Sequence, residues 1–171
     1  MKRIVITGPE STGKSWLAEN LARHYNTVWI PEYAREYIAK LDRPYNQDDI
    51  LEIARKQLQQ EEIMAQKAND FLFADTSMIV TKIWNIYVYG NCPAWIDDQI
   101  ENHRYDLYLL CYIDTPWEYD PQREHPHARK ELFQLYEQEL SSRNLPHKII
   151  SGINQNRLEN AIKAIEEYFR E

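Results

Sequence analysis

The chain alternates between short apolar runs of strand length and longer segments whose apolar residues recur at helical spacing. Two of the runs, 71–74 and 107–113, are apolar throughout, which is typical of parallel strands that are buried on both faces. The pattern predicts strands at 2–7, 27–30, 71–75, 107–113 and 147–151. Because strands and helices alternate along the chain, we expect an α/β fold with a mostly parallel, five-stranded sheet.

The segments between these strands carry helical patterns. Helices are predicted at 14–25, 32–41, 46–68 and 154–169. Asn46 is the expected N-cap of the longest helix, because acidic residues follow it in the first turn. The run Gln-Gln-Glu-Glu at 59–62 is interpreted as a solvated face of that helix.

Length and composition indicate a globular protein with one domain over residues 1–171. The chain has 43% hydrophobic and 27% charged residues, and its longest apolar run falls far short of the ~20 residues that span a membrane. A net charge of −7 leaves no basic surplus for a nucleic-acid backbone, so neither nucleic acid nor a membrane is an expected partner. Cys92 and Cys111 have no close partner at metal-ligand spacing, which predicts reduced thiols and a cytoplasmic location.

A phosphate-binding loop follows the first predicted strand. Residues 8–15, Gly-Pro-Glu-Ser-Thr-Gly-Lys-Ser, match the pattern G-x-x-x-x-G-K-[ST] in full. In such a loop Lys14 reaches the β- and γ-phosphates, and the Ser15 hydroxyl is a ligand of Mg²⁺. The expected nucleotide-binding residues are Gly8, Glu10, Ser11, Thr12, Gly13, Lys14 and Ser15. The sequence therefore predicts a P-loop NTPase fold, a three-layer α/β/α arrangement that binds a nucleoside triphosphate.

Asp75 is expected in the same site, because it ends a predicted strand. An aspartate in this place of a P-loop protein holds Mg²⁺ directly or through water. Thr76 follows it where hydrolysing ATPases commonly carry a glutamate, and the guanine-reading pattern N-K-x-D is absent from the chain. These features favour ATP as the donor and an acceptor other than water. Asp75 can alternatively be the base for an acceptor hydroxyl, or only the cap of the next helix.

Charged residues also follow the predicted strand at 27–30. Ligands of open α/β sheets bind outside the carboxyl ends of the strands, so Glu32, Tyr33 and Arg35 are expected in the same crevice. A carboxylate, a phenol and a guanidinium can together bind a polyhydroxylated acceptor and a phosphate. The alternative is a charged first helical turn, where the helix dipole favours Glu32.

The segment from about 116 to 130 combines prolines, charges and aromatic residues, which predicts a mobile lid. Phosphoryl transfer needs cations over the γ-phosphate and exclusion of water, and a closing lid with Arg123 and Arg129 would provide both. His125 and His127 have no evident third ligand with which to hold a metal ion. An ordinary solvated connector is the alternative.

Several motifs of this chain occur together in one kinase family. They are the loop with its Glu10-Ser11 pair, the segment Glu-Tyr-Ala-Arg-Glu at 32–36, the strand end Asp75-Thr76, and the pattern W-x-x-D-x-x-R formed by Trp117, Asp120 and Arg123. Their combination resembles the ribosylnicotinamide kinase domain of NadR-type proteins and its stand-alone relatives. The order and spacing agree from about residue 2 to 170.

The resemblance implies a nucleoside-kinase-like P-loop enzyme that uses ATP and Mg²⁺ to phosphorylate the 5′-hydroxyl of nicotinamide riboside, giving nicotinamide mononucleotide. On the acceptor side it implies Glu32, Tyr33, Arg35, Asp75 and Asp120. On the donor side it implies Lys14, Ser15, Trp117, Arg123 and Arg129. Lys14, Asp75, Glu32 and Arg123 would be the catalytic residues, and Ser15 and Asp75 would hold the metal. Tyr119 and Pro121 stand where the family carries an acidic residue and a glycine.

Two further expectations concern specificity. A cationic nicotinamide ring favours aromatic or acidic neighbours, and Trp84, Tyr87, Trp95 and Trp117 are candidates, although aromatic residues at these spacings also suit a core.

Because the loop begins at residue 8, we expect no adenylyltransferase or DNA-binding domain before it and none of the activities of such domains. The alternatives are a kinase for another nucleoside or nucleoside-like vitamin, and a nucleotide-dependent regulatory ATPase or binding module.

Overall fold

The central sheet has the strand order β2-β3-β1-β4-β5, and every neighbouring pair is parallel. The computed structural model describes residues 1–170, which form five strands and seven helices. The strands are β1 (Lys2–Thr7), β2 (Trp29–Ile30), β3 (Phe71–Asp75), β4 (Leu107–Cys111) and β5 (His147–Ile150). The helices are α1 (Lys14–His24), α2 (Tyr33–Ala39), α3 (Gln47–Ala65), α4 (Met78–Tyr89), α5 (Ala94–Asn102), α6 (Arg129–Ser142) and α7 (Gln155–Arg170). The predicted α/β fold with a parallel five-stranded sheet is confirmed.

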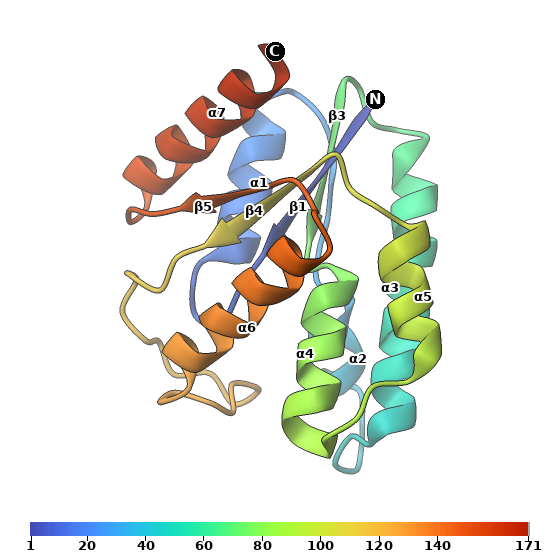
Figure 1. Ribbon diagram of the computed structural model, residues 1–171. Helices are drawn as coiled ribbons and strands as arrows, with labels where there is room; N and C mark the ends of the chain where they lie inside the picture. Colours follow the sequence, from blue (N-terminus) through green and yellow to red (C-terminus); the bar gives the residue numbers. More distant parts are fainter. Residues whose placement is uncertain (171) are drawn as a thin grey trace.

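Helices cover both faces of the sheet, so the architecture has three layers (Figure 1). Successive side chains of a strand point to opposite faces. In β1, Ile4 and Ile6 pack with α1 and α7, whereas Val5 packs with α3, α4, α5 and α6. This alternation explains why the inner strands are apolar throughout.

The carboxyl ends of β1, β3 and β4 meet at one edge of the sheet. The register pairs Ile6 with Asp75 and Thr7 with Leu110, so the loop after β1 lies between the ends of its two neighbours. Parallel strands leave their ligand crevice at this edge. The topology therefore places the phosphate-binding loop and Asp75 side by side.

Asn46 caps α3 as predicted. Its side chain accepts a hydrogen bond from the Asp49 backbone at 3.0 Å, and the Asp49 carboxylate accepts one from the Asn46 backbone at 2.8 Å. Such a capping box satisfies N–H groups that the first turn leaves without intrahelical partners. The helix ends at Ala65, earlier than the predicted 68.

The interpretation of residues 59–62 as a solvated face is wrong for Glu61. This side chain is completely buried. It accepts a hydrogen bond of 2.6 Å from the Tyr105 hydroxyl and lies 3.0 Å from Nε2 of His103. A carboxylate can be buried where the fold supplies such partners, and these two come from the segment before β4.

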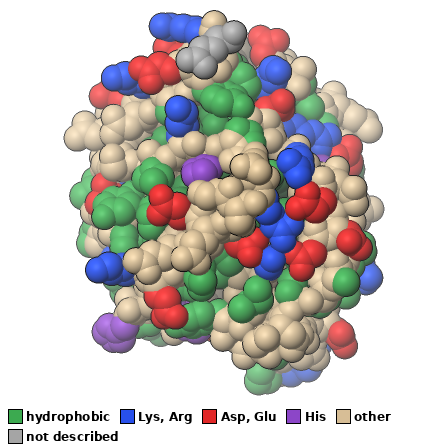
Figure 2. All heavy atoms as spheres, in the orientation of Figure 1, with side chains coloured by type: hydrophobic (Ala, Val, Ile, Leu, Met, Phe, Trp, Pro, Cys, Tyr) green, Lys and Arg blue, Asp and Glu red, His purple; other side chains and the backbone are tan. Residues whose placement is uncertain are grey.

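Acidic and basic side chains are interspersed on the face shown in Figure 2, with no continuous basic surface there. Among residues 1–170 no helix combines the length and the apolar character needed to cross a membrane.

Candidate active site

The phosphate-binding loop connects β1 to α1 through residues in positive-φ conformations. Gly8 has a φ of 136°, and a Cβ there would lie 3.0 Å from the carbonyl oxygen of Cys111, so this position requires glycine. Gly13 has a φ of 75° and is the N-cap of α1. The Thr12 hydroxyl and the Lys14 ammonium both donate to the carbonyl of Pro9, at 2.8 and 2.9 Å. These two hydrogen bonds close the loop on itself directly before the N-terminus of α1. Backbone N–H groups at a helix N-terminus bind phosphate.

Asp75 is completely buried and lies against the start of α1. The Ser15 hydroxyl donates to one carboxylate oxygen of Asp75, and the Thr76 hydroxyl donates to the other at 3.3 Å. Burial raises the pKa of Asp75, while the charge of Lys14 and the hydroxyl donors oppose the rise. Since Ser77 is the N-cap of α4, the alternative that Asp75 only caps this helix does not apply.

The Ser15–Asp75 pair fits a magnesium ion. Mg²⁺ takes one or two protein oxygen ligands and completes its shell with water and substrate phosphates. No group of three or more His, Cys, Asp and Glu side chains in residues 1–170 is arranged to hold a metal ion by itself. A metal at this place would therefore depend on the nucleotide for the rest of its ligands.

Glu32 is the second carboxyl group of the site. It follows β2 directly and is half-buried in the cavity wall. Burial and the neighbouring charge of Asp75 raise the pKa of Glu32 to about 7, while Lys14 and Arg35 oppose the rise. Glu32 is the N-cap residue of α2, where the helix dipole favours a carboxylate, but its side chain makes no capping hydrogen bond to that helix. Two carboxyl groups beside one lysine can hold a hydroxyl and accept its proton.

A cavity of about 960 Å³ opens beside these groups. One part of its wall is polar and consists of the phosphate-binding loop, the start of α2 and the lid. The other part is apolar and aromatic, and it includes Ile38, Tyr45, Trp84, Tyr87, Leu132 and Tyr136. This size and division suit a ligand that carries both a phosphate end and an apolar ring.

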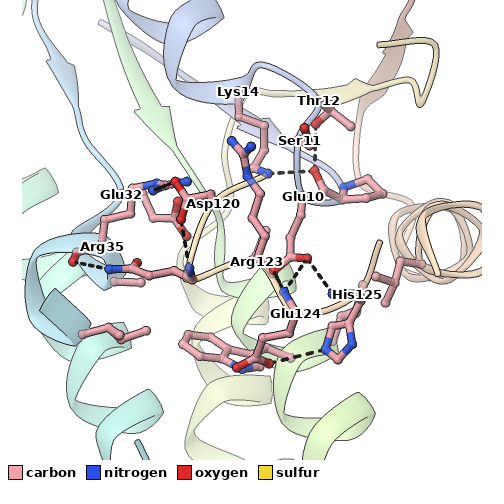
Figure 3. A pocket seen from close by; sticks show the side chains of 18 of the residues that line it. Glu10, Ser11, Thr12, Lys14, Glu32, Arg35, Asp120, Arg123, Glu124 and His125 are labelled. Carbon is pink, nitrogen blue, oxygen red and sulfur yellow. Dashed lines mark hydrogen bonds and ion pairs between the residues drawn. The ribbon is translucent and has the colours of Figure 1, made fainter. Parts of the chain in front are cut away.

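The segment predicted to be a lid, about residues 116–130, contacts both the phosphate-binding loop and the start of α2. The Glu10 carboxylate accepts hydrogen bonds from the backbone of Glu124 and His125, at 3.3 and 3.2 Å. Arg35 forms an ion pair of 2.8 Å with Asp120. In Figure 3 the Arg123 side chain points toward the end of the cavity where Lys14 lies. The lid therefore brings a cation to the phosphate side while it contacts the acceptor side.

The structure brings most of the predicted site residues together. Those that line the cavity are Gly8, Glu10, Ser11, Thr12, Gly13, Lys14, Ser15, Glu32, Arg35, Asp120 and Arg123. Asp75 lies behind Ser15.

Besides Asp75, three predicted site residues lie outside the cavity wall: Tyr33, Trp117 and Arg129. The Tyr33 backbone donates to the Gln57 side chain at 2.8 Å, and its ring lies against Tyr37. Arg129 donates to the carbonyls of Ser11 and Thr115, at 3.2 and 2.8 Å, with its guanidinium 5.8 Å from the ring centre of Trp117. Arg129 and Trp117 thus brace the lid against the loop.

Two residues of the site were missed in the sequence. Gln57 is buried on α3 and joins the carbonyl of Asp75, at 3.2 Å, to the backbone N–H of Tyr33. Its sequence signal was a polar residue seven positions after Ile50, on the inward stripe of the helix. Tyr45 had no such signal, because its partners lie far along the chain.

Tyr45 belongs to an aromatic wall that closes the apolar end of the cavity. Its hydroxyl donates to Glu124 at 2.8 Å and accepts from the Trp84 indole at 3.0 Å. Tyr87 packs edge-on against His125, with ring centres 4.7 Å apart. Of the aromatic candidates, Trp84 and Tyr87 line the cavity, whereas Trp95 packs against the core.

This chain is similar to a known protein family and to NadR proteins. A family of proteins described as an AAA domain matches residues 3–157, which is most of the chain. The trifunctional NAD biosynthesis/regulator protein NadR of Escherichia coli (strain K12) is 29% identical over 153 residues, which are 85% of this chain and 37% of that protein. The chain thus spans little more than a third of the length of this relative.

Solved structures share the fold. The crystal structure of a NadR protein in complex with NR is similar over 98% of this chain and 51% of that one, with a TM-score of 0.78 and 24% identity. A deoxyadenosine kinase from M. mycoides is similar over 96% of this chain and 99% of that one, with a TM-score of 0.68 and 12% identity. The predicted resemblance to NadR-type proteins is confirmed, and the fold is that of nucleoside kinases.

A complete phosphate-binding loop, a carboxylate behind it and a nucleoside-sized cavity therefore occur here on a kinase fold. The phosphate-binding loop is that of a nucleotide-binding protein, and solved nucleoside kinases share the fold. The chain belongs to the P-loop family described as an AAA domain, and NadR proteins are its relatives.

Proposed function

We propose that this protein transfers the γ-phosphoryl group of ATP to the 5′-hydroxyl of nicotinamide riboside and so forms nicotinamide mononucleotide. The observation that carries the proposal is the position of Glu32. Its carboxyl group lines the same cavity as the phosphate-binding loop and the aromatic wall, and it is close enough to Asp75 and Lys14 for their charges to shift its pKa. A ribose hydroxyl placed there would face the γ-phosphate on one side and a carboxylate on the other.

The residues divide the work as follows. The loop and Lys14 bind the donor phosphates, and Arg123 adds positive charge from the lid. Ser15 and Asp75 would hold Mg²⁺, whose charge neutralises the β- and γ-oxygens when it is bound. Glu32 orients the acceptor hydroxyl and takes its proton late in the transfer. A pKa of about 7 suits this role, because the carboxylate is then both available and basic near neutral pH.

The aromatic wall supports a cationic ring as the apolar part of the acceptor. Trp84 and Tyr87 line the cavity, and the Tyr45 hydroxyl donates a hydrogen bond to Glu124, which also lines it. An aromatic surface with a nearby carboxylate attracts a ring that carries positive charge. The NadR protein in complex with NR, which has the same fold, supports the same choice.

The test is release of ADP from MgATP in the presence of single acceptors: nicotinamide riboside, adenosine, deoxyadenosine, thymidine and thiamine. We expect nicotinamide riboside to stimulate ADP release most and its phosphorylated product to be found by mass. A preference for another nucleoside would show that the protein is a kinase but would reject nicotinamide riboside as its acceptor. ADP release that no acceptor changes would favour a regulatory ATPase instead.

Lys14→Ala is the control for the donor site. Because the transition state is loose, positioning and charge neutralisation dominate the rate. We expect turnover with saturating MgATP to fall by at least about 10²-fold. Lys40→Ala removes the C-cap residue of α2, a surface lysine that pairs with Glu36, and it should leave turnover unchanged.

A further inference from the structure

Arg157 is the largest completely buried side chain among residues 1–170, with 1% of its surface exposed. It lies in the first part of α7, outside the cavity described above. A guanidinium is almost never buried without a dense set of partners, because it keeps its charge at any pH that the protein meets. Its partners therefore show what the fold uses it for.

The guanidinium joins three segments that are distant in the sequence. Nη1 donates to the carbonyl of Thr12 at 2.5 Å, Nε donates to the carbonyl of Gly152 at 2.7 Å, and Nη2 donates to the carbonyl of Tyr112 at 2.9 Å. Nη2 also donates to a carboxylate oxygen of Asp114. Thr12 belongs to the phosphate-binding loop, Tyr112 and Asp114 follow β4, and Gly152 follows β5.

Asp114 completes the arrangement. Its second carboxylate oxygen accepts a hydrogen bond of 2.6 Å from the backbone of Gly152. Gly152 has a φ of 97°, and a Cβ there would lie 3.0 Å from the Arg157 backbone. The loop after β5 thus approaches α7 closely, and both partners of the ion pair hold it there.

We propose that Arg157 is a positioning residue for the donor nucleotide. By fixing the carbonyl of Thr12 to the ends of β4 and β5, it holds the loop in the conformation that presents its N–H groups to the phosphates. Thr12 lies directly before Gly13, the N-cap of α1, so a displaced Thr12 carbonyl moves the helix start that binds the anion. The inference rests on the nucleotide site of the proposed function and extends it to a residue that lies outside the cavity.

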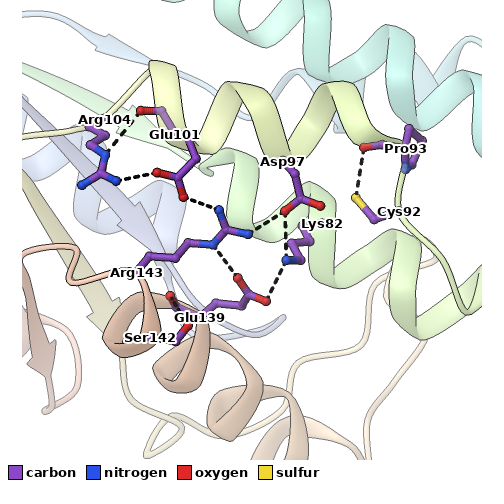
Figure 4. A network of polar contacts seen from close by, with 9 residues as sticks. All are labelled: Lys82, Cys92, Pro93, Asp97, Glu101, Arg104, Glu139, Ser142 and Arg143. Atoms are coloured by element: carbon purple, nitrogen blue, oxygen red, sulfur yellow. Dashed lines mark hydrogen bonds and ion pairs between the residues drawn. The ribbon is translucent and has the colours of Figure 1, made fainter.

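Arg143 offers a matched comparison, because it is also an arginine that ties elements together. It forms ion pairs with Asp97, Glu101 and Glu139 at 2.6, 2.6 and 2.9 Å (Figure 4). These partners belong to α5 and α6, and none belongs to the phosphate-binding loop. Replacing Arg143 therefore disturbs a network of arginine hydrogen bonds without touching the nucleotide site.

The experiment compares Arg157→Lys with Arg143→Lys. A lysine keeps the charge but carries its donors on one atom, so it cannot span three carbonyls. Binding of MgADP is measured by calorimetry, Tm by thermal unfolding, and KM separately for ATP and for the acceptor. We expect Arg157→Lys to weaken MgADP binding about tenfold and to raise KM for ATP similarly, with KM for the acceptor changed less than about twofold. Arg143→Lys should lower Tm and leave MgADP binding at the wild-type value.

Wild-type affinity for MgADP in Arg157→Lys, or equal weakening in both variants, would overturn the proposal. If Arg157→Lys does not fold, MgADP binding is measured instead with Asp114→Asn. That variant keeps Arg157 but removes its ion-pair partner, so weaker MgADP binding supports the proposal and unchanged binding rejects it. Because ADP binds without an acceptor, failure to phosphorylate nicotinamide riboside would reject that substrate and leave this result intact.

Discussion

Asp75 and Glu61 are both completely buried acids, but Asp75 ends β3, whereas Glu61 lies on α3 beside the segment that precedes β4. Glu61 has a tyrosine hydroxyl on one oxygen and His103 on the other. Asp75 has only the hydroxyls of Ser15 and Thr76, and a second carboxyl group, Glu32, lies near it. The fold provides hydrogen-bond partners for both oxygens of Glu61 from its own core, whereas Asp75 lies where a cation or a substrate can bind. Buried acids whose pKa values are raised are typical of functional sites.

This contrast predicts that Asp75→Asn will have the largest effect on activity. The amide has the same shape but no charge for Mg²⁺ or for the developing charge of the transfer. We expect kcat/KM to fall by about 10³-fold while the free energy of unfolding stays the same or rises. Initial rates of ADP release and urea unfolding measure the two quantities. An active Asp75→Asn would remove the distinction between the two acids.

Glu32→Gln should have the next largest effect. If Glu32 accepts the proton of the acceptor hydroxyl, its amide lowers kcat by about 10²-fold, within the usual range for a general base. KM for ATP should change little, because the loop and Lys14 are untouched. A variant that loses only affinity for the acceptor, with kcat intact, would make Glu32 a binding group and not a base.

Glu61→Ala tests the other member of the comparison. Its loss leaves the Tyr105 hydroxyl buried without its partner, so we expect the free energy of unfolding to fall by about 2 kcal/mol. The kcat/KM of the folded variant should stay near that of the wild type. The double-mutant cycle with Tyr105→Phe isolates the hydrogen bond, and zero coupling energy would show that the two groups do not stabilise each other.

The smallest predicted effect is the pH dependence of stability without nucleotide or Mg²⁺. The pKa of Glu32 is raised from 4.5 in the unfolded chain to about 7, so its ionisation costs more in the folded state. The stability of the wild type that comes from protonated Glu32 is complete below pH 4.5 and is lost as pH rises through 7. Glu32→Gln has no such ionisation, so the Tm of the variant should rise relative to the Tm of the wild type as the pH increases from 4.5 to above 7. Thermal melts that run parallel at every pH contradict the raised pKa.

The sequence predicted the parts of the site that depend on local order. Asp75 was found because it ends an apolar run, and the loop was found because its backbone conformation needs two glycines and its phosphate contacts need a lysine, all at fixed spacing. Tyr33, predicted on the acceptor side, is not among the residues that line the cavity, because neighbouring residues of a helix point about 100° apart. Glu32 and Arg35, three positions apart, both line the cavity, whereas the Tyr33 ring lies against Tyr37.

Contacts between distant segments could not be predicted in this way. Glu61 meets Tyr105 across 44 positions, and Arg157 meets Thr12 across 145. Both are charged residues at helical positions whose environment depends on which element the fold lays against them. Local periodicity carries no information about such partners, so only the structure reveals that these side chains are buried.

The most direct test of the central claim follows the γ-phosphoryl group itself. Wild-type protein is given MgATP with a ³²P label in the γ-position, with and without nicotinamide riboside, beside Asp75→Asn. We expect the label to appear in nicotinamide mononucleotide in step with ADP, and to stay in ATP with the variant. Label that appears only as inorganic phosphate, at a rate that nicotinamide riboside does not change, would contradict the account.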